Sequence, residues 1–177
     1  VDFYATWCGP CKMMSEKVFP QESVGAFAND KFVTVKLQFD STAKDDEYVK
    51  ANYALASKIK KDYGIAAYPS FMVFNAEGEP VHRFVGAYQA SEFIEVLKKS
   101  TDEKQQFYNL VKQYTQDSTK VANVKSMAEA ANSAYAPSFA NRAYTQWIKL
   151  EGNKILNNKE DVLSLIENAN SKDDVIF

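Results

Sequence analysis

Two cysteines separated by two residues, Cys8 and Cys11, are the side chains of this sequence whose type and spacing most directly permit chemistry. An apolar run over residues 1–5 precedes them and predicts a buried strand, and a helical segment follows at once. This order places one sulfur at the N-terminus of a helix, where partial positive charge stabilises a thiolate. A thiolate beside a second thiol can attack a disulfide and then be displaced by its neighbour. The pair therefore predicts a dithiol–disulfide exchanger.

The composition limits which other chemistry the chain could perform. The net charge is −2 and the only arginines are Arg83 and Arg142, so no basic face for a nucleic acid is expected. Two cysteines are too few for a scaffold stapled by several disulfides or for a four-thiolate zinc site, and the single histidine, His82, lies far along the chain. Lys12 follows Cys11 where a c-type haem attachment needs a histidine. We expect no metal, no cofactor and, because no apolar run is long enough, no membrane span.

The elements that would position the cysteines follow from the hydrophobic pattern. Short apolar runs rich in β-branched and aromatic residues predict strands over residues 1–6, 32–39, 71–74 and 81–85. Helices are expected over residues 8–19, 21–29 and 47–62, and in a fourth segment with Ser91 as its N-cap. The strand–helix–strand order implies a parallel pair, and a hairpin around residues 75–78 adds antiparallel strands to the same sheet. Residues 1–99 are thus expected to form an α/β domain.

Beyond Ser100 the strand signals disappear and helical periodicity replaces them. Apolar residues recur at helical spacing over residues 107–114, 121–131, 139–150 and 162–169. Gly152 closes the third of these stripes. We expect about four short helices, and hence an all-α extension over residues 100–177.

The first hundred residues resemble the thioredoxin family at several ordered positions. The shared motifs are VDFYATWCGPCK at residues 1–12, VKLQFD at 35–40, YGIAAYPS at 63–70 and VGA at 85–87, with a hairpin around Gly78. This series is much more specific than an isolated pair of cysteines. The resemblance implies the thioredoxin fold, a central mixed sheet flanked by helices, for residues 1–99. Residues 100–177 lie outside it.

The resemblance also implies roles for individual residues. Cys8 would be the attacking thiolate and Cys11 the resolving thiol. Asp2 matches the buried acid that moves a proton to and from the resolving cysteine, and Lys36 matches the lysine that pairs with this acid. Burial would raise the pKa of the Asp2 carboxyl, and Lys36 would limit that rise. The alternatives are an exposed aspartate at a strand end and a lysine on a solvated face.

Further residues are expected to bind the substrate beside the disulfide: Trp7, Gly9, Pro10, Tyr68 and Pro69. By the resemblance, Trp7 flanks the exposed sulfur and Pro69 is the cis-proline that faces the disulfide. Pro10 suits the first turn of a helix, where its missing N–H costs nothing, and Gly9 would let a substrate backbone approach closely. The Tyr68 backbone could pair with an extended substrate. Its ring is equally compatible with lining the groove and with packing.

Some positions depart from the family pattern. Glu16 stands where the first helix usually has a kinking proline, and the break comes later at Pro20. The connection over residues 40–62 is longer than usual. The pattern of residues 19–33 resembles an exported branch, so a periplasmic or otherwise exported setting is expected, with a cytoplasmic reductase served by a flavin-dependent partner as the alternative. Because the chain begins inside the first expected strand, it shows nothing about a preceding signal peptide.

Together these observations predict a thiol–disulfide oxidoreductase that reduces or exchanges protein disulfides. Its expected partners are disulfide-containing proteins and an upstream reductant or thiol–disulfide interchange protein. Two other hypotheses stay open: a scaffold whose helical extension recruits a partner, and a redox sensor in which oxidation of the pair changes how the extension docks. The extension could also mediate self-association or cap the substrate groove.

Several side chains elsewhere have simpler interpretations. His82 is expected on the solvent side of the hairpin, and the lysines of residues 58–61 on a solvated helix face. Trp147 and Phe139 are expected in the core of the helical extension. An exposed groove is the alternative for three aromatic residues, Tyr135, Tyr144 and Trp147.

Overall fold

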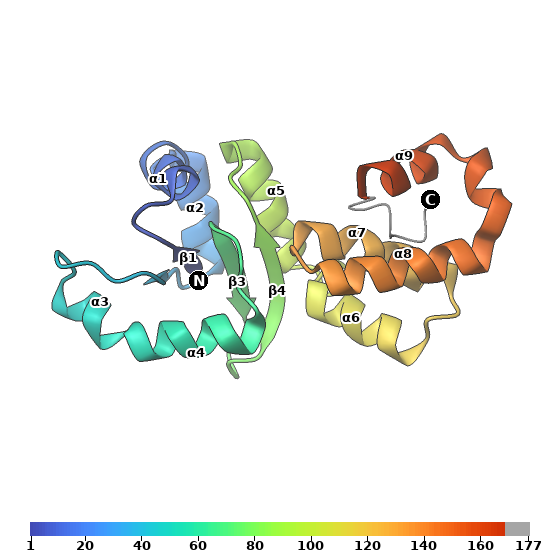
Figure 1. Ribbon diagram of the computed structural model, residues 1–177. Helices are drawn as coiled ribbons and strands as arrows, with labels where there is room; N and C mark the ends of the chain where they lie inside the picture. The colour runs from blue at the N-terminus through green and yellow to red at the C-terminus, as the bar shows by residue number, and fades with distance from the viewer. Residues whose placement is uncertain (169–177) are drawn as a thin grey trace. The chain divides into compact units, whose positions relative to one another are not determined.

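In the computed structural model, which describes residues 1–168, four short strands form one mixed sheet (Figure 1). The strands are β1 (Asp2–Tyr4), β2 (Lys36–Gln38), β3 (Ser70–Phe74) and β4 (Pro80–Val85), in the spatial order β2-β1-β3-β4. β1 and β2 run parallel, with Asp2 opposite Lys36. β3 is antiparallel to both β1 and β4. The predicted parallel pair and the predicted antiparallel hairpin are confirmed.

β2 is shorter than the strand that its sequence predicts. The expected strand covers residues 32–39, but only Lys36–Gln38 pair with β1, although the Asp2 amide still donates to the Val35 carbonyl at 2.8 Å. β1 has three residues, so the ladder ends where its partner strand ends. Val33 is 92% exposed, because a β-branched residue favours extended backbone whether or not another strand lies beside it.

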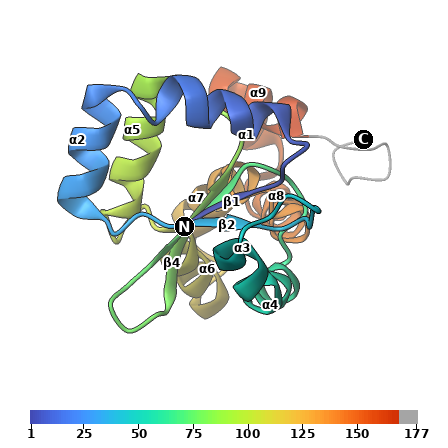
Figure 2. The same ribbon diagram turned by 90° about the vertical axis from the view of Figure 1, so that its left-hand side faces the viewer.

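Helices cover both faces of the sheet (Figure 2). One face carries α1 (Gly9–Met13), the π-helix η1 (Met14–Val18), α2 (Glu22–Lys31) and α5 (Ala90–Ser100). The opposite face carries α3 (Glu47–Ala51) and α4 (Tyr53–Tyr63). Phe71 and Phe84 stack with their ring centroids 4.8 Å apart in the core on the first face. Met72, the next residue along β3, is fully buried on the other side, since successive side chains of a strand point to opposite faces.

The expected helix over residues 8–19 is present, but its second half is not α-helical. From Met14 to Val18 it is a π-helix, in which the Phe19 amide donates to the Met14 carbonyl five residues back at 2.9 Å. The segment contains Glu16 at the position where the resembling family usually has a proline. The wider turn therefore replaces a proline kink, and Pro20 follows the end of the helix.

Two other helices begin or break at residues that the sequence did not indicate. The expected helix over residues 47–62 is interrupted at Asn52, which has φ −97° and ψ 0° and separates α3 from α4. Ser91 is not the N-cap of α5, so that prediction is wrong. Gln89 caps the helix, because the Glu92 carboxylate accepts a hydrogen bond from the Gln89 amide at 2.9 Å and fixes the first turn there.

A second compact unit begins at Glu103, the first unit being Val1–Asp102. Its described elements are α6 (Phe107–Gln116), α7 (Val121–Ser133), α8 (Pro137–Glu151), the 3₁₀-helix η2 (Gly152–Asn157) and α9 (Lys159–Asn168). The predicted helical stripes are confirmed, and Gly152 ends α8 as expected, with φ 52°. Ala169, the last residue of the fourth stripe, lies outside the described residues.

The core of the second unit is centred on Trp147, which is 1% exposed. Tyr144 is 3% exposed, whereas Tyr135 is 54% exposed. These aromatic residues therefore do not line a common exposed groove, and the interpretation of Trp147 as a core residue is confirmed. Phe139 packs against the same cluster as a half-buried residue.

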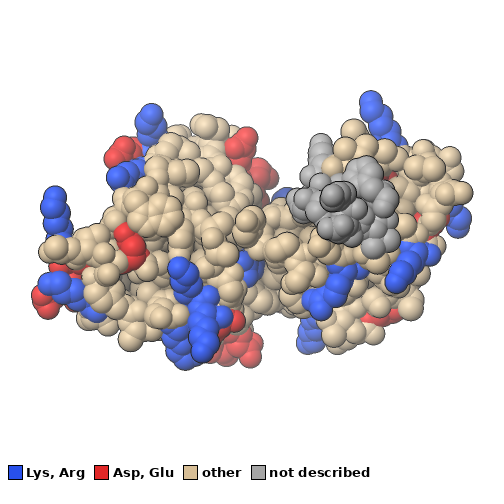
Figure 3. All heavy atoms as spheres, viewed as in Figure 1, with Lys and Arg blue, Asp and Glu red and all other residues tan. Residues whose placement is uncertain are grey.

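The described part of the chain has no helix suited to span a membrane, and charged side chains of both signs lie on its surface. No helix within residues 1–168 is long and apolar enough to cross a bilayer. On the face drawn in Figure 3, groups of lysine and arginine side chains lie among uncharged residues, with aspartate and glutamate also present. The full sequence carries a net charge of −2.

Candidate active site

The two cysteines form a disulfide at the start of α1. Cys8 is the N-cap residue, and its Sγ accepts a hydrogen bond from the Cys11 amide at 3.1 Å. Pro10 occupies the first turn, where no backbone N–H is required. The prediction that one sulfur lies at a helix N-terminus is confirmed. This position offers a Cys8 thiolate both an N–H donor and the positive end of the helix.

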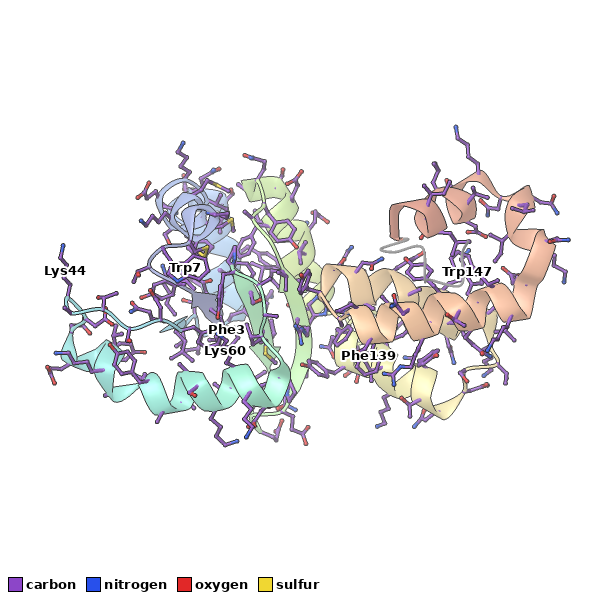
Figure 4. The ribbon with its side chains drawn as sticks, in the orientation of Figure 1. Phe3, Trp7, Lys44, Lys60, Phe139 and Trp147 are labelled. Atoms are coloured by element: carbon purple, nitrogen blue, oxygen red, sulfur yellow. A yellow bond between two sulfur atoms is a disulfide. The ribbon has the colours of Figure 1, made fainter. Side chains whose placement is uncertain are left out.

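Aromatic side chains cover the disulfide more closely than the sequence predicted. Cys8 is 3% exposed and Cys11 4% exposed, in a cluster with Ala5 against which the Tyr68 ring packs. Trp7, which precedes Cys8 in the chain, is 69% exposed (Figure 4). The expectation that Trp7 flanks an exposed sulfur is therefore wrong for this oxidised state, because the attacking sulfur is itself covered.

Tyr68 is the centre of this cover. Its ring makes edge-on contacts with Trp7 and with Phe39, each with ring centroids 5.7 Å apart. Lys60 Nζ reaches across from α4 to a point 5.6 Å from the centre of the ring. The ring thus packs over the disulfide and also forms the rim of the site, so the two alternatives for Tyr68 are not exclusive. The sequence pattern predicts only a solvated helix face for Lys60, and does not indicate this contact.

The residues on either side of the Tyr68 ring suit the approach of an extended chain. The Tyr68–Pro69 peptide bond is cis, and the Pro69 side chain is fully buried. The Gly86 amide donates to the Pro69 carbonyl at 3.0 Å, whereas no backbone hydrogen bond to Tyr68 is found within residues 1–168. Gly9 is exposed, and a Cβ built there would meet no atom within 4 Å. A substrate backbone could therefore approach from this side.

Asp2 lies on β1 opposite Lys36 in the β1–β2 register, and most of its side chain is shielded from solvent. Its side chain is 12% exposed, and Lys36 Nζ is 3.9 Å from Asp2 Oδ2. The Asp2 Oδ1 atom has no hydrogen-bond partner among the described residues. Burial raises the pKa of the Asp2 carboxyl to about 6, and the Lys36 ammonium group opposes part of that rise. The structure thus brings together the two residues that the sequence paired.

Sequence reasoning missed two polar residues that hold the loops around the disulfide. The Asp40 carboxylate accepts hydrogen bonds from both the amide and the hydroxyl of Thr6, just before Trp7. The Asp45 carboxylate accepts from Gln38 and from the Thr42 amide at 2.9 and 2.7 Å. A signal existed for each: Asp40 directly follows a predicted strand, and Thr42-x-x-Asp45 has the spacing of a side chain-capped turn.

His82 is not on the solvent side of the hairpin, so that prediction is wrong. It is 6% exposed on β4, and burial lowers its pKa to about 4, with Lys99 as a second cause. A histidine with this pKa stays neutral at physiological pH and can be packed among apolar groups. Within residues 1–168, no three His, Cys, Asp or Glu side chains gather as metal ligands.

Comparison with known proteins places this site in a family. The family described as a thioredoxin-like domain matches residues 1–101. The chain is 36% identical over 98 residues to a thioredoxin-like protein of Synechocystis sp., covering 55% of this chain and 76% of that protein. It is 33% identical over 102 residues to the chloroplastic thioredoxin Y of Oryza sativa subsp. japonica, covering 58% of this chain and 50% of that protein.

A third relative is the thioredoxin of Mycolicibacterium smegmatis, with 37% identity over 87 residues that cover 49% of this chain and 63% of that protein. The matched residues include the disulfide cysteines, Asp2 and the cis-proline Pro69. The chain belongs to the thioredoxin-like family of thiol–disulfide oxidoreductases.

Proposed function

We propose that the chain reduces or exchanges disulfides in protein substrates through Cys8 and Cys11. The observation that carries this proposal is the place of Cys8 at the N-cap of α1, with its sulfur accepting the Cys11 amide hydrogen bond. The same contact would hold a Cys8 thiolate in the reduced protein. A stabilised thiolate is the species that attacks a disulfide.

The proposed reaction has two exchange steps. The Cys8 thiolate attacks one sulfur of the substrate disulfide, and the other substrate sulfur leaves as a thiolate. Cys11 then loses its proton and attacks Cys8 Sγ, which releases the second substrate sulfur and forms the Cys8–Cys11 disulfide seen here. Two electrons pass from the dithiol to the substrate, and no further reactant is needed.

Asp2 is the proposed acceptor of the Cys11 proton. A carboxylate whose pKa is raised to about 6 is a better base than an exposed aspartate and is still ionised at neutral pH. Lys36 would keep enough positive charge nearby for the ionised form to persist in a buried place. Together they would make the second exchange step depend on pH near the Asp2 pKa.

We further propose that the substrate enters over Trp7 and Gly9 and pairs with the Tyr68 backbone. The exposed Trp7, the open space at Gly9 and the absence of a backbone hydrogen bond to Tyr68 within the described residues support this path. Because the Tyr68 ring covers a disulfide whose cysteines are nearly buried, the ring must shift when a substrate sulfur reaches Cys8.

The experiment that tests this function is the reduction of insulin by dithiothreitol in the presence of the protein. The wild-type chain should accelerate the reaction, and the Cys8→Ser variant should give only the uncatalysed rate. Lys17→Ser, on an exposed part of η1, serves as a matched control and should behave as the wild type. Equal activity in wild type and Cys8→Ser would refute the proposal.

The direction of exchange and the cellular setting are separate proposals. We propose a reducing role in a periplasmic or otherwise exported setting, supplied by an upstream reductant or thiol–disulfide interchange protein. The Gly9-Pro10 pair between the cysteines and the pattern of residues 19–33 support it. Equilibration with glutathione or dithiothreitol should give a reduction potential near that of thioredoxin, about −270 mV, rather than the values of about −120 to −180 mV found for oxidants and isomerases.

A further inference from the structure

The Lys36 ammonium group makes its shortest polar contact with a serine rather than with its carboxylate partner. Lys36 Nζ donates to Ser15 Oγ at 2.7 Å, whereas Asp2 Oδ2 is 3.9 Å away, beyond hydrogen-bond distance. The same ammonium lies 4.8 Å from the centre of the Tyr4 ring. Ser15 belongs to η1, so the π-helix supplies the group that fixes the end of the Lys36 side chain.

Lys36 lines two cavities, one that also contains Cys11 in its wall and one that also contains Asp2. A cavity of about 250 Å³ is lined by Cys11, Ser15 and Lys36, among other residues. A larger cavity of about 680 Å³ has both Asp2 and Lys36 in its wall. The position of one ammonium group therefore affects the carboxylate that receives the proton and the space beside the thiol that gives it up.

We propose that Ser15 is a positioning residue, which holds the Lys36 ammonium group out of direct contact with Asp2 and so keeps Asp2 basic enough to accept the Cys11 proton. The inference rests on the proposed role of Asp2. In the second exchange step the proton passes from Cys11 Sγ to an Asp2 carboxylate oxygen and then to water. The Cys11 sulfur bonds to Cys8 Sγ, the bond from Cys8 to the substrate sulfur breaks, and that sulfur leaves as a thiolate. Ser15 exchanges no proton and contacts no reacting atom.

The other charged groups near Asp2 do not explain why the Lys36 ammonium group stays 3.9 Å from the Asp2 carboxylate. The Val1 amino group, just before β1, and the Tyr4 phenol on β1 interact with the Asp2 charge. On β3 the residue opposite Asp2 is Phe71, which does not titrate. Lys31 of α2 lines the larger cavity, but its ammonium pairs with Asp30 at 2.9 Å. The cation facing Asp2 from another strand is Lys36, whose nearest anchor among the described residues is Ser15.

Removal of the Ser15 hydroxyl should lower the pKa of the Asp2 carboxyl. In Ser15→Ala the ammonium loses its 2.7 Å acceptor, and the Asp2 carboxylate, whose Oδ1 atom has no hydrogen-bond partner among the described residues, becomes its best alternative. Closing from 3.9 Å to a charge-assisted hydrogen bond of about 2.8 Å lowers the pKa by about one unit at an effective dielectric of about 20. Ser15→Thr keeps a hydroxyl and should leave the pKa unchanged.

The test is a titration of the Asp2 carboxyl carbon by NMR in the oxidised full chain. We expect the Asp2 pKa to fall in Ser15→Ala and to match the wild type in Ser15→Thr. In a Lys36→Met background, Ser15→Ala should have no effect, because the group that Ser15 positions is gone. An unchanged or higher Asp2 pKa in Ser15→Ala would overturn the proposal, as would an equal shift in the Lys36→Met background.

A second measurement connects the same variant to the reaction. The rate at which Cys11 resolves a preformed mixed disulfide should decline on the acid side of its pH profile as Asp2 becomes protonated. In Ser15→Ala this decline should occur at a pH about one unit lower than in the wild type. The plateau rate above it should also be lower, because a weaker base accepts the proton. A purely structural role for Ser15 would lower the rate without moving this decline. The NMR titration needs no activity, so failure of this inference is distinguishable from failure of the proposed function, which Cys8→Ser tests.

Discussion

Above about pH 6, Asp2 carries a negative charge on a largely buried side chain, and Lys36 Nζ lies 3.9 Å from its Oδ2 atom. The unfolded chain has no such cost, because there the carboxyl titrates near its ordinary value of 3.8. Between these two pH values the folded protein binds more protons than the unfolded one. Its free energy of unfolding therefore falls as the pH rises through this window. The residue that we propose as acceptor of the Cys11 proton thus lowers stability at neutral pH.

Asp2→Asn should remove this penalty. The stability contributed by the raised pKa is fully present below pH 3.8 and is lost as the pH rises through about 6. The free energy of unfolding of the variant minus that of the wild type should be about 3 kcal/mol larger at pH 8 than at pH 3.5. This value follows from a shift of two pKa units at about 1.4 kcal/mol each. Urea unfolding of both proteins across this range measures the gain. A stability difference independent of pH would contradict the burial of the charge.

At the site, residue types alone predicted part of the chemistry. The spacing of Cys8 and Cys11 after an apolar run was sufficient to place a sulfur at a helix N-terminus. The partnership of Asp2 with Lys36 came from a family resemblance, because residues 34 positions apart have no local pattern that pairs them. Ser15 could not be found in this way, since its contact with Lys36 depends on the turn of η1 over β2.

At the scale of elements, the end of β2 fixes the loop that precedes the disulfide. Asp40 lies just after β2, and its carboxylate accepts both the Thr6 amide, at 2.9 Å, and the Thr6 hydroxyl. The segment between β1 and α1 is thereby tied to the neighbouring strand immediately before Trp7. Hydrogen bonds to a charged acceptor are stronger than neutral ones, so this contact should matter to both stability and the position of Trp7.

Asp40→Ala should lower the free energy of unfolding by about 1–3 kcal/mol, because the half-buried Thr6 amide loses its acceptor. Asp30→Ala is a matched control: it removes a carboxylate that pairs with Lys31 on an exposed surface and should change stability little. Urea unfolding of the full chain compares the three proteins. Equal unfolding midpoints for Asp40→Ala and wild type would show that the hydrogen bonds between Thr6 and Asp40 contribute nothing to stability.

The elements also show where local sequence patterns stop being informative. The order of strands and helices was predictable, because apolar runs and turn residues alternate clearly. The π-helix and the break at Asn52 were not, because each depends on backbone hydrogen bonds that several sequences satisfy equally well. The cap at Gln89 instead depends on the Glu92 carboxylate, which accepts the Gln89 amide. His82 was misplaced because a histidine can be solvated or buried neutral, and only the packing on β4 decides.

At the scale of the whole molecule, the disulfide and the helices after Glu103 belong to different units. Each unit has its own buried core, one containing Phe71 and Phe84 and the other containing Trp147. We propose that exchange is a property of the first unit alone. The scaffold and sensor hypotheses instead require the helical unit for function.

Trp147→Ala separates these hypotheses in the full chain. The side chain is 1% exposed, and its Nε1 donates to Glu151 at 2.9 Å, so its loss should destabilise the second unit by about 3–5 kcal/mol. Insulin reduction should keep its wild-type rate. Leu156→Ala, at a residue that is 71% exposed, controls for the loss of an apolar side chain. Insulin reduction that falls with the stability of the second unit would favour the other hypotheses.

The most direct test of the central claim is to identify which sulfur bonds to the substrate. Reduced Cys11→Ser protein, full length, is mixed with insulin, and the trapped mixed disulfide is mapped by mass spectrometry of its peptides. The account predicts a stable adduct on Cys8, because the resolving thiol is missing. No adduct on Cys8, or an equal yield through Cys11 in the Cys8→Ser protein, would contradict it.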